Sequence, residues 1–494
     1  MSQSQESGSG YKLPSATTMQ DHLETLQQFR QALYSSFRYR RDSLLDLIDA
    51  LSSNDRAQAP VELSLNPLFR RRYSALYRAI SAAYLESEFP VCSLESDKQE
   101  QAILATVPLP SRQSYQVFGI DETPTERLYA RCLADRQTVH RSTPVPGQLP
   151  ISLGHNYSIL AVMPEASPDE WPRWAVPCSV ERVSTLSNAI TVAQSQVAQL
   201  MRSPRVQLMP LKVLTVDSRY PTPAFLHPLN GYRDLVIVAR LRGNRVVFQH
   251  PDSRQDKTRP RWYGERFCLQ EEATWPAAQE EATVSLTDSQ GRAIALQLRR
   301  WSNLLMRGTR LYPMHRFPFD LVQVQSLNDD QHPKGRPLWL LVWGQHRQQL
   351  PLVEVRQAYS QRFNLEHFLG FAKPHLLLSA SQSCLTAHEI NWVRLSCLAY
   401  VQLWLARDLV SILPLPWQRY LAQGRKRQAT PRSVQRSFAR LIQQMGSIAV
   451  SPKPRGISPG RARGTRLTPR APCPQVKFHP SRKRCRCQNA QKTS

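Results

Sequence analysis

The chain has 494 residues, 41% of them hydrophobic, and a formal net charge of +26 at neutral pH. That apolar fraction excludes disorder throughout, and the lack of any run of about 18 uncharged apolar residues excludes a membrane-spanning helix. A basic excess of this size favours a polyanionic partner, and nucleic acid is the usual one.

The positive charge is concentrated at the C-terminus, where residues 409–494 hold 19 Lys and Arg and no Asp or Glu. Such a tail either contacts DNA phosphates or is solvated without a partner. The polar start MSQSQESGSG has no apolar signal segment, and the nine cysteines are irregularly spaced, which favours reduced thiols over a disulfide framework. These features predict a cytoplasmic protein.

The N-terminal part is predicted to be helical after a disordered segment, residues 1–18. Two amphipathic patterns are followed by a third helix that begins at Asn66-Pro67 and carries Arg70, Arg71, Arg72 and Arg78. We interpret residues 19–105 as a helical domain. It either binds DNA or is a bundle with an ordinary charged face.

An α/β pattern begins at residue 113. Alternating apolar residues lead into Asp121, a second strand is predicted over 158–163, and a helix over 186–202. The strand over 212–216 again ends on an acid, Asp217. Strand, helix and strand in this order predict an α/β core with a mixed sheet over residues 113–234.

The pattern of apolar, polar and turn-forming residues changes again in the rest of the chain. Short β-rich stretches separated by turns predict an all-β insertion over residues 235–345, and residues 346–412 return to helical periodicity. Residues 413–494 are rich in Pro, Gly, Arg and Ser, which predicts a largely disordered tail with one short helix near 431–445.

Two acids at strand ends in a basic protein are candidate metal ligands. Phosphodiester cleavage commonly uses two Mg²⁺ ions, which take carboxylate oxygens held on rigid elements. Asp121 and Asp217 meet that need, although aspartates at strand ends are also common turn formers.

A third element strengthens this interpretation. Residues 359–373 read YSQRFNLEHFLGFAK, in which Tyr359, Arg362, Glu366 and Lys373 follow the pattern Y-x2-R-x3-E-x6-K. Spacings of four and seven residues put Arg362, Glu366 and Lys373 on one helix face. A carboxylate flanked by two cations suits a metal ligand beside DNA phosphates. The ordinary alternative is a solvent-facing Arg–Glu pair.

This string resembles the YREK signature of the DDE transposases of bacterial cut-and-paste insertion sequences. FGIDETP around Asp121 and VLTVDSRY around Asp217 resemble that family's first and second acidic motifs. The resemblance covers residues 115–412, and the helical N-terminal part and the SPKPRGISPGRARG tail resemble a cyanobacterial subgroup. Arg219 departs from the small residue that is frequent at that position, whereas Tyr220 is retained.

The resemblance implies an α/β, RNase H-like catalytic core that is interrupted by the insertion. It implies that Asp121, Asp217 and Glu366 are catalytic and bind two Mg²⁺ or Mn²⁺ ions, and that Tyr359, Arg362 and Lys373 bind DNA. The implied partners are the terminal inverted repeats and target DNA, with a homodimer assembled on DNA ends in the bacterial nucleoid. The implied reaction is strand cleavage, often through a DNA hairpin, followed by strand transfer.

Two alternatives remain open: a catalytically inactive or domesticated DNA-binding derivative, and a nuclease of the same core fold that acts on branched DNA. Relatives hold a flipped base with an insertion-domain tryptophan, for which Trp275 and Trp301 are weak candidates. Zinc binding by Cys473, His479, Cys485 and Cys487 is disfavoured because the spacing fits no four-ligand pattern. His155 is interpreted as a buried, hydrogen-bonded histidine.

Overall fold

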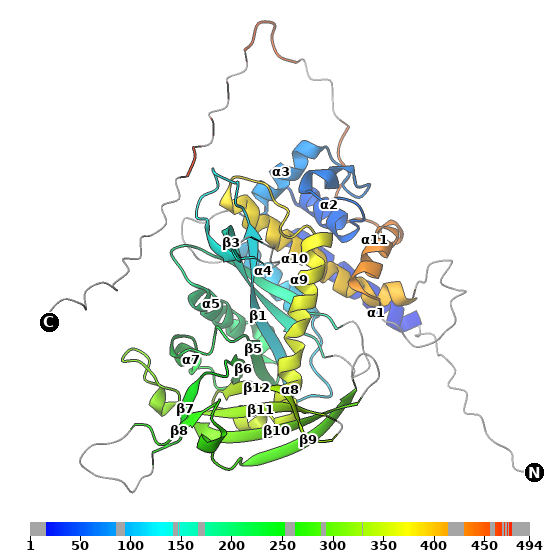
Figure 1. Ribbon diagram of the computed structural model, residues 1–494. Helices are drawn as coiled ribbons and strands as arrows, with labels where there is room; N and C mark the ends of the chain where they lie inside the picture. The colour runs from blue at the N-terminus through cyan, green and yellow to red at the C-terminus, as the bar shows by residue number, and fades with distance from the viewer. Residues whose placement is uncertain are drawn as a thin grey trace, which may run out of the picture.

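A long mixed β-sheet runs through the molecule, and helices from both ends of the chain gather at one end of it (Figure 1). The computed structural model describes residues 16–84, 94–141, 147, 149–165, 173–251, 262–287, 293–328, 330–412, 429–454, 460–466, 469, 472 and 474–476. None of the helices in these ranges is both long enough and apolar enough to cross a membrane.

The central sheet has ten strands, in the order β2-β3-β1-β5-β6-β12-β11-β10-β9, with β4 also paired to β3. Its first half comprises β1 (Tyr115–Glu126), β2 (Gln137–His140), β3 (Ile151–Met163), β4 (Val176–Val183), β5 (Leu211–Val216) and β6 (Leu235–Leu241). The second half comprises β9 (Glu280–Thr287), β10 (Ala293–Leu304), β11 (Phe319–Leu327) and β12 (Pro333–Trp343), and β7 (Val246–Phe248) pairs with β8 (Arg266–Cys268) in a separate two-stranded sheet.

The strands β1, β5 and β6 are parallel neighbours in the middle of this sheet. Every residue of β5 is buried, as expected for a parallel strand covered on both faces. The helices α5 (Ala189–Arg202) and α7 (Pro223–Leu229) lie on one side, and α8 (Leu352–Gln361) and α9 (Phe363–His375) on the other (Figure 1). The short helix α6 (Pro204–Gln207) packs against α5. The predicted mixed α/β architecture is therefore confirmed.

The β-rich stretch that begins at residue 235 continues the same sheet. Its first strand, β6, pairs in parallel with β5, and β12 then pairs antiparallel with β6. Because the ladder is unbroken from β2 to β9, the second half of the sheet is hydrogen-bonded directly to the half that carries Asp121 and Asp217.

The helical end is built from α1 (Ala16–Ser36), α2 (Arg41–Ser52), the 3-10 segment η1 (Pro60–Leu65), α3 (Tyr73–Ala82), α4 (Leu94–Thr106), α10 (Thr386–Ile412) and α11 (Pro431–Met445). The 3-10 segments η2 (Glu272–Thr274), η3 (Met314–Arg316) and η4 (Arg347–Gln349) lie elsewhere in the chain. Figure 1 shows α10 passing between the N-terminal helices and the sheet. Ala16 to Thr18, inside the segment predicted to be disordered, belong to α1.

The prediction that a helix starts at Asn66-Pro67 is wrong. The Asn66 side chain instead accepts a hydrogen bond from the Leu68 N–H, at 2.9 Å, and forms a turn, so that α3 begins only at Tyr73. Arg70 and Arg71 consequently lie before the helix, where both guanidinium groups pair with the buried carboxylate of Asp46.

The tail helix is confirmed as α11. Its apolar side chains, including Val434 and Phe438, are fully buried, and the chain that follows is held by Arg70 and Arg71, which donate hydrogen bonds to the carbonyls of Ala449 and Val450. At least residues 429–450 of the basic tail are therefore part of the folded body.

A buried ionic cluster joins the sheet to α10. The Glu389 carboxylate lies 3.5 Å from Arg127 Nε at the end of β1 and 3.4 Å from His155 Nδ1 on β3. Arg127 also donates hydrogen bonds to the carbonyls of Ser381 and Ser383, in the loop before α10. His155 is fully buried and hydrogen-bonded to the Ala134 carbonyl, as expected from the sequence.

Candidate active site

The two candidate aspartates lie at the same end of the parallel pair β1–β5. That pairing stops at Gly119 and Thr215, so Asp121 and Asp217 both come two residues beyond it. The expectation that Asp121 ends its strand is wrong, because β1 continues to Glu126 while paired with β3. What ends near Asp121 is the pairing with β5, which leaves the Asp121 side chain 26% exposed and within reach of the charge of Asp217.

The glutamate is delivered to this position by α9, which packs against β1. A Cβ atom added at Gly119 would lie 2.8 Å from Leu365 Cδ1, closer than real Cβ contacts come. The glycine therefore permits the close approach of helix to strand. Glu366, the next residue after Leu365, is thereby held beside the strand that carries Asp121.

Arg362 connects two of the three carboxylates. It lies at the junction of α8 and α9, with its side chain 8% exposed. Its Nη2 donates a hydrogen bond of 2.7 Å to Glu366 Oε1, and its Nη1 lies 3.6 Å from Asp121 Oδ2. Its guanidinium carbon also lies 5.8 Å from the ring centre of Tyr359, so that the first three members of the Y-x2-R-x3-E pattern meet in space.

The electrostatics show that all three acids share one site. Burial raises the pKa of Asp121 to about 6, Arg362 and the Glu122 N–H oppose the rise, and the charges of Asp217 and Glu366 add to it. Burial lowers the pKa of Lys373, which the charges of Asp121 and Glu126 oppose. The structure thus brings together all six residues singled out from the sequence.

The carboxylates of Asp121, Asp217 and Glu366 are suitable ligands for a hard divalent cation, but they are not already grouped around one point. Carboxylate oxygens are the ligands Mg²⁺ prefers, and a bound cation would offset both the burial that chiefly raises the pKa of Asp121 and the smaller repulsion from Asp217 and Glu366. Among the described residues, however, no three His, Cys, Asp or Glu side chains are already grouped closely enough to hold a metal ion. The Arg362 guanidinium supplies positive charge between Asp121 and Glu366 instead.

A second ion pair, which the sequence did not predict, ties the two aspartate segments together. Arg219 Nη1 donates a hydrogen bond of 2.7 Å to Glu122 Oε2, and the buried Tyr220 hydroxyl lies 3.5 Å from the other Glu122 oxygen. Arg219 and Glu122 each neighbour a candidate ligand. The residue that departs from the family pattern therefore clamps the Asp217 loop onto β1.

The two weak tryptophan candidates lie in an aromatic core. Trp301 is 2% exposed, and the Trp275 indole donates a hydrogen bond to the Cys268 carbonyl at 2.7 Å. Both rings pack against Trp339 and Phe267. The cysteines and histidine weighed for zinc lie outside the described residues.

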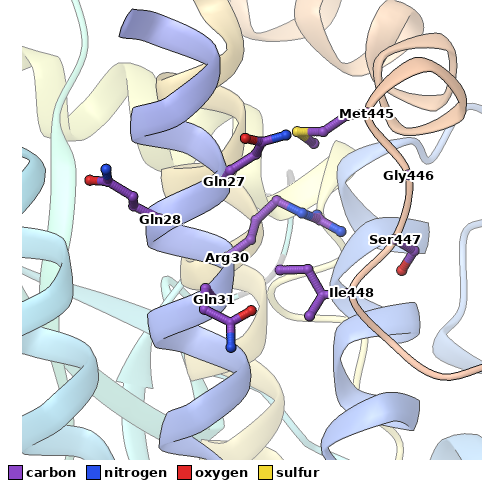
Figure 2. Close-up of a pocket in the computed structure, with 8 residues that line it drawn as sticks. All are labelled: Gln27, Gln28, Arg30, Gln31, Met445, Gly446, Ser447 and Ile448. Atoms are coloured by element: carbon purple, nitrogen blue, oxygen red, sulfur yellow. The ribbon is translucent and has the colours of Figure 1, made fainter.

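A surface hollow of about 400 Å³ lies away from these acids, between α1 and the chain that follows α11 (Figure 2). It is lined by Gln27, Gln28, Arg30, Gln31, Met445, Gly446, Ser447 and Ile448. The Arg30 guanidinium is already engaged by Asp49 and Gln402 in the core. The hollow contains none of the candidate catalytic residues.

Comparison with protein families gives a match to the model described as DDE superfamily endonuclease over residues 32–306, more than half of the chain. The chain belongs to the DDE superfamily endonucleases. A comparison with curated proteins found no match. Among solved structures, a piggyBac transposase synaptic complex with hairpin DNA aligns over 88% of this chain and 84% of that chain, at 11% identity and a TM-score of 0.32, which is too low to support any inference.

For this DDE endonuclease, we expect Arg219→Ala to slow strand cleavage about tenfold or more, because small displacements of catalytic groups have large effects on rate. Arg219 is exposed, so the melting temperature should change little. The double variant Glu122→Arg/Arg219→Glu should recover part of the rate. Arg266→Ala, which removes another exposed Arg–Glu pair, serves as the control. Equal cleavage by Arg219→Ala and Arg266→Ala would refute the clamp.

Proposed function

We propose that the protein is a transposase that cleaves the ends of an insertion sequence and transfers the strands to target DNA. One observation carries the proposal. In a chain of the DDE endonuclease family, Arg362 pairs with a carboxylate from β1 and one from α9, and the Asp217 carboxylate from the loop after β5 acts electrostatically on Asp121. The Y-x2-R-x3-E-x6-K string supports the YREK class, and the SPKPRGISPGRARG segment supports the cyanobacterial subgroup.

We further propose that residues 113–234 and 346–412 form an RNase H-like catalytic core. The strand order β4-β3-β1-β5, with β1 and β5 parallel and β3 antiparallel, supports that assignment. Residues 235–345 would form the insertion, residues 19–105 a helical DNA-binding domain and residues 413–494 the basic tail. The partners are double-stranded terminal repeats and target DNA, bound by a homodimer.

Asp121, Asp217 and Glu366 would hold two Mg²⁺ or Mn²⁺ ions. When bound, the ions would lower the pKa of an attacking hydroxyl and neutralise charge on the reacting phosphate. The remaining work falls to side chains of this chain. Arg362, released from Asp121 and Glu366, can bind a phosphate with two parallel N–H donors, while Tyr359 supports the guanidinium and Lys373 adds a second cation.

Glu366→Gln tests the assignment, because the amide keeps the size of the side chain and removes its charge. With a duplex that carries the inverted repeat found beside the gene, the variant should lose cleavage by at least about 10³-fold, as expected for loss of an essential group. Its DNA affinity in EDTA should stay within about twofold of that of the wild type, since phosphate contacts dominate binding. Cleavage at the wild-type rate would disprove the proposed role of Glu366.

The same DNA substrate distinguishes an active transposase from the inactive, DNA-binding alternative. A wild-type protein that binds the repeat and cleaves it in neither Mg²⁺ nor Mn²⁺ would favour a decayed transposase. Preference for branched DNA over the repeat would favour a structure-selective nuclease of the same family.

A further inference from the structure

The face of α9 that points away from the sheet is open along its length. Its exposed positions are spaced three or four residues apart and therefore form one stripe: Phe363, Glu366, His367, Gly370 and Pro374. The opposite face carries Leu365 and Phe368, which are fully buried. The stripe runs from Phe363 past Glu366, the proposed catalytic glutamate, to the helix end at His375.

Gly370 lies in the middle of this stripe, and no contact within the described part of the protein requires a glycine there. A Cβ atom built there would have no neighbour within 4 Å, in contrast to Gly119. Glycine is the weakest helix former after proline, so a helix-interior position with free space would normally favour almost any other residue. A glycine in such a place is accounted for by a partner whose backbone comes close to the helix.

Beyond the end of α9 lies α11, which contacts His375 and whose arginines act electrostatically on it. This helix has Arg432, Arg436 and Arg440 at four-residue spacing and no acidic residue. Arg432 is neutralised by Asp55, at 2.9 Å, whereas Arg436 is exposed and has no acidic partner among the described residues. Burial and the charges of Arg432 and Arg436 lower the pKa of His375, which indicates a positive potential at this junction.

The position of α11 relative to the catalytic glutamate is fixed by hydrogen bonds. Gln435 Nε2 donates to the carbonyls of His375, at 3.0 Å, and Leu51, at 3.1 Å. Nine residues of α9 separate Glu366 from His375, or about 14 Å at 1.5 Å per residue. Since one strand of a duplex advances 3.4 Å per nucleotide, this length corresponds to about four base pairs. Figure 1 shows α11 at the end of α9.

We propose that the open stripe of α9 and the Arg436 face of α11 form one DNA-backbone track, in which a strand held at the carboxylates passes closely over Gly370 and reaches Arg436. The occupant is DNA, because a polyanion matches a face with unpaired arginine charge and needs no side-chain pocket. The track rests on the proposed function and adds where the DNA lies beyond the scissile phosphate.

The test uses the full chain, in EDTA, and a fluorescein-labelled duplex of arbitrary sequence, about 30 base pairs long, titrated between about 0.05 and 0.5 M salt. Arg436→Ala should reduce the slope of log affinity against log salt by about 0.9 and weaken binding about eightfold near 0.1 M salt. Arg436→Lys should retain the slope. Gln443→Ala, exposed on the same helix, and Lys98→Ala, exposed on α4, should match the wild type.

Gly370→Ala provides a second, independent test of the track. Alanine is the better helix former, so the melting temperature should rise by about 1–2 °C. DNA affinity should nevertheless fall, and Gly370→Leu should lower it further. Gly243→Ala, at another glycine with open space around it, should leave affinity unchanged. A purely structural role for Gly370 predicts no loss of affinity.

The two proposals fail in different ways. Binding is measured without a divalent ion and is therefore independent of cleavage. If Arg436→Ala and Gly370→Ala weaken binding as expected but the wild type never cleaves DNA, only the proposed function is contradicted. Protein that cleaves DNA while Arg436→Ala and Gly370→Ala bind like the wild type overturns the track alone.

Discussion

Replacing Asp121 with asparagine should make the protein more stable near neutral pH while abolishing strand cleavage. Burial raises the pKa of this carboxyl from 3.8 to about 6, so its proton is held more tightly in the folded chain than in the unfolded one. The protonated Asp121 carboxyl therefore stabilises the fold fully below about pH 4, and this stabilisation is lost as the pH rises through about 6. Above that pH the wild type contains an unfavourable buried charge that asparagine lacks.

A pKa rise of this size corresponds to on the order of 2–3 kcal/mol. We expect a smaller gain of about 1–2 kcal/mol near pH 7.5, because the Asp121 side chain is 26% exposed and solvent screens its charge. Denaturant unfolding near pH 7.5 and near pH 4 measures the effect, and the gain should vanish at the lower pH. Mg²⁺ should raise the melting temperature of the wild type and not that of the variant.

Asp42→Asn is the matched control, with the opposite sign. Although burial opposes it, hydrogen bonds from the Tyr34 hydroxyl and the Val450 N–H hold the pKa of Asp42 below its usual value. This carboxylate therefore stabilises the fold above about pH 4, and its replacement should lower stability near pH 7.5. An Asp121→Asn protein that is no more stable than the wild type, or whose gain in stability persists near pH 4, would show that the ionised Asp121 carboxylate does not destabilise the fold.

Glu389→Ala should destabilise the fold by about 3–5 kcal/mol, the largest loss we expect from a single side chain outside the apolar core. The carboxylate is 1% exposed and is the charged partner of buried Arg127 and of His155. Its removal leaves a guanidinium in the interior between β1 and α10 with only carbonyl partners. Urea unfolding would measure the change.

Glu281→Ala is the comparison for that loss, because Glu281 pairs with Arg299 at a position where its side chain is 52% exposed. An exposed pair contributes about 0–1 kcal/mol, so this variant should unfold nearly as the wild type does. If the two variants are equally stable, the buried cluster does not hold the sheet to α10.

Local patterns predicted most of the elements and, together with the family resemblance, the members of the candidate site. Alternation of apolar residues predicted β1 and β5, helical periodicity predicted α5, α10 and α11, and the spacing of Arg362 and Glu366 predicted their shared helix face. These succeed because burial on one face imposes a period that the sequence displays directly.

One error arose from a local hydrogen bond, and the other differences arose where partners distant in sequence decide. Pro67 is a good first residue for a helix, but Asn66 hydrogen-bonds locally and its turn replaces the first helical residues. Pairing with β3 carries β1 past Asp121, which no local pattern indicates. The Arg219–Glu122 clamp joins residues 97 positions apart, and each reads alone as an ordinary surface charge.

The chain order of the candidate site also has a consequence for synthesis. Asp121 lies near the start of the sheet, whereas Glu366 and the packed helix α11 follow more than 240 residues later. At about 5–20 residues per second, the ribosome needs roughly 12–50 s to travel from the first carboxylate to the third. Throughout that interval the nascent chain holds at most two of the three acids, so under the proposed function a stalled or truncated product would lack a complete set of metal ligands.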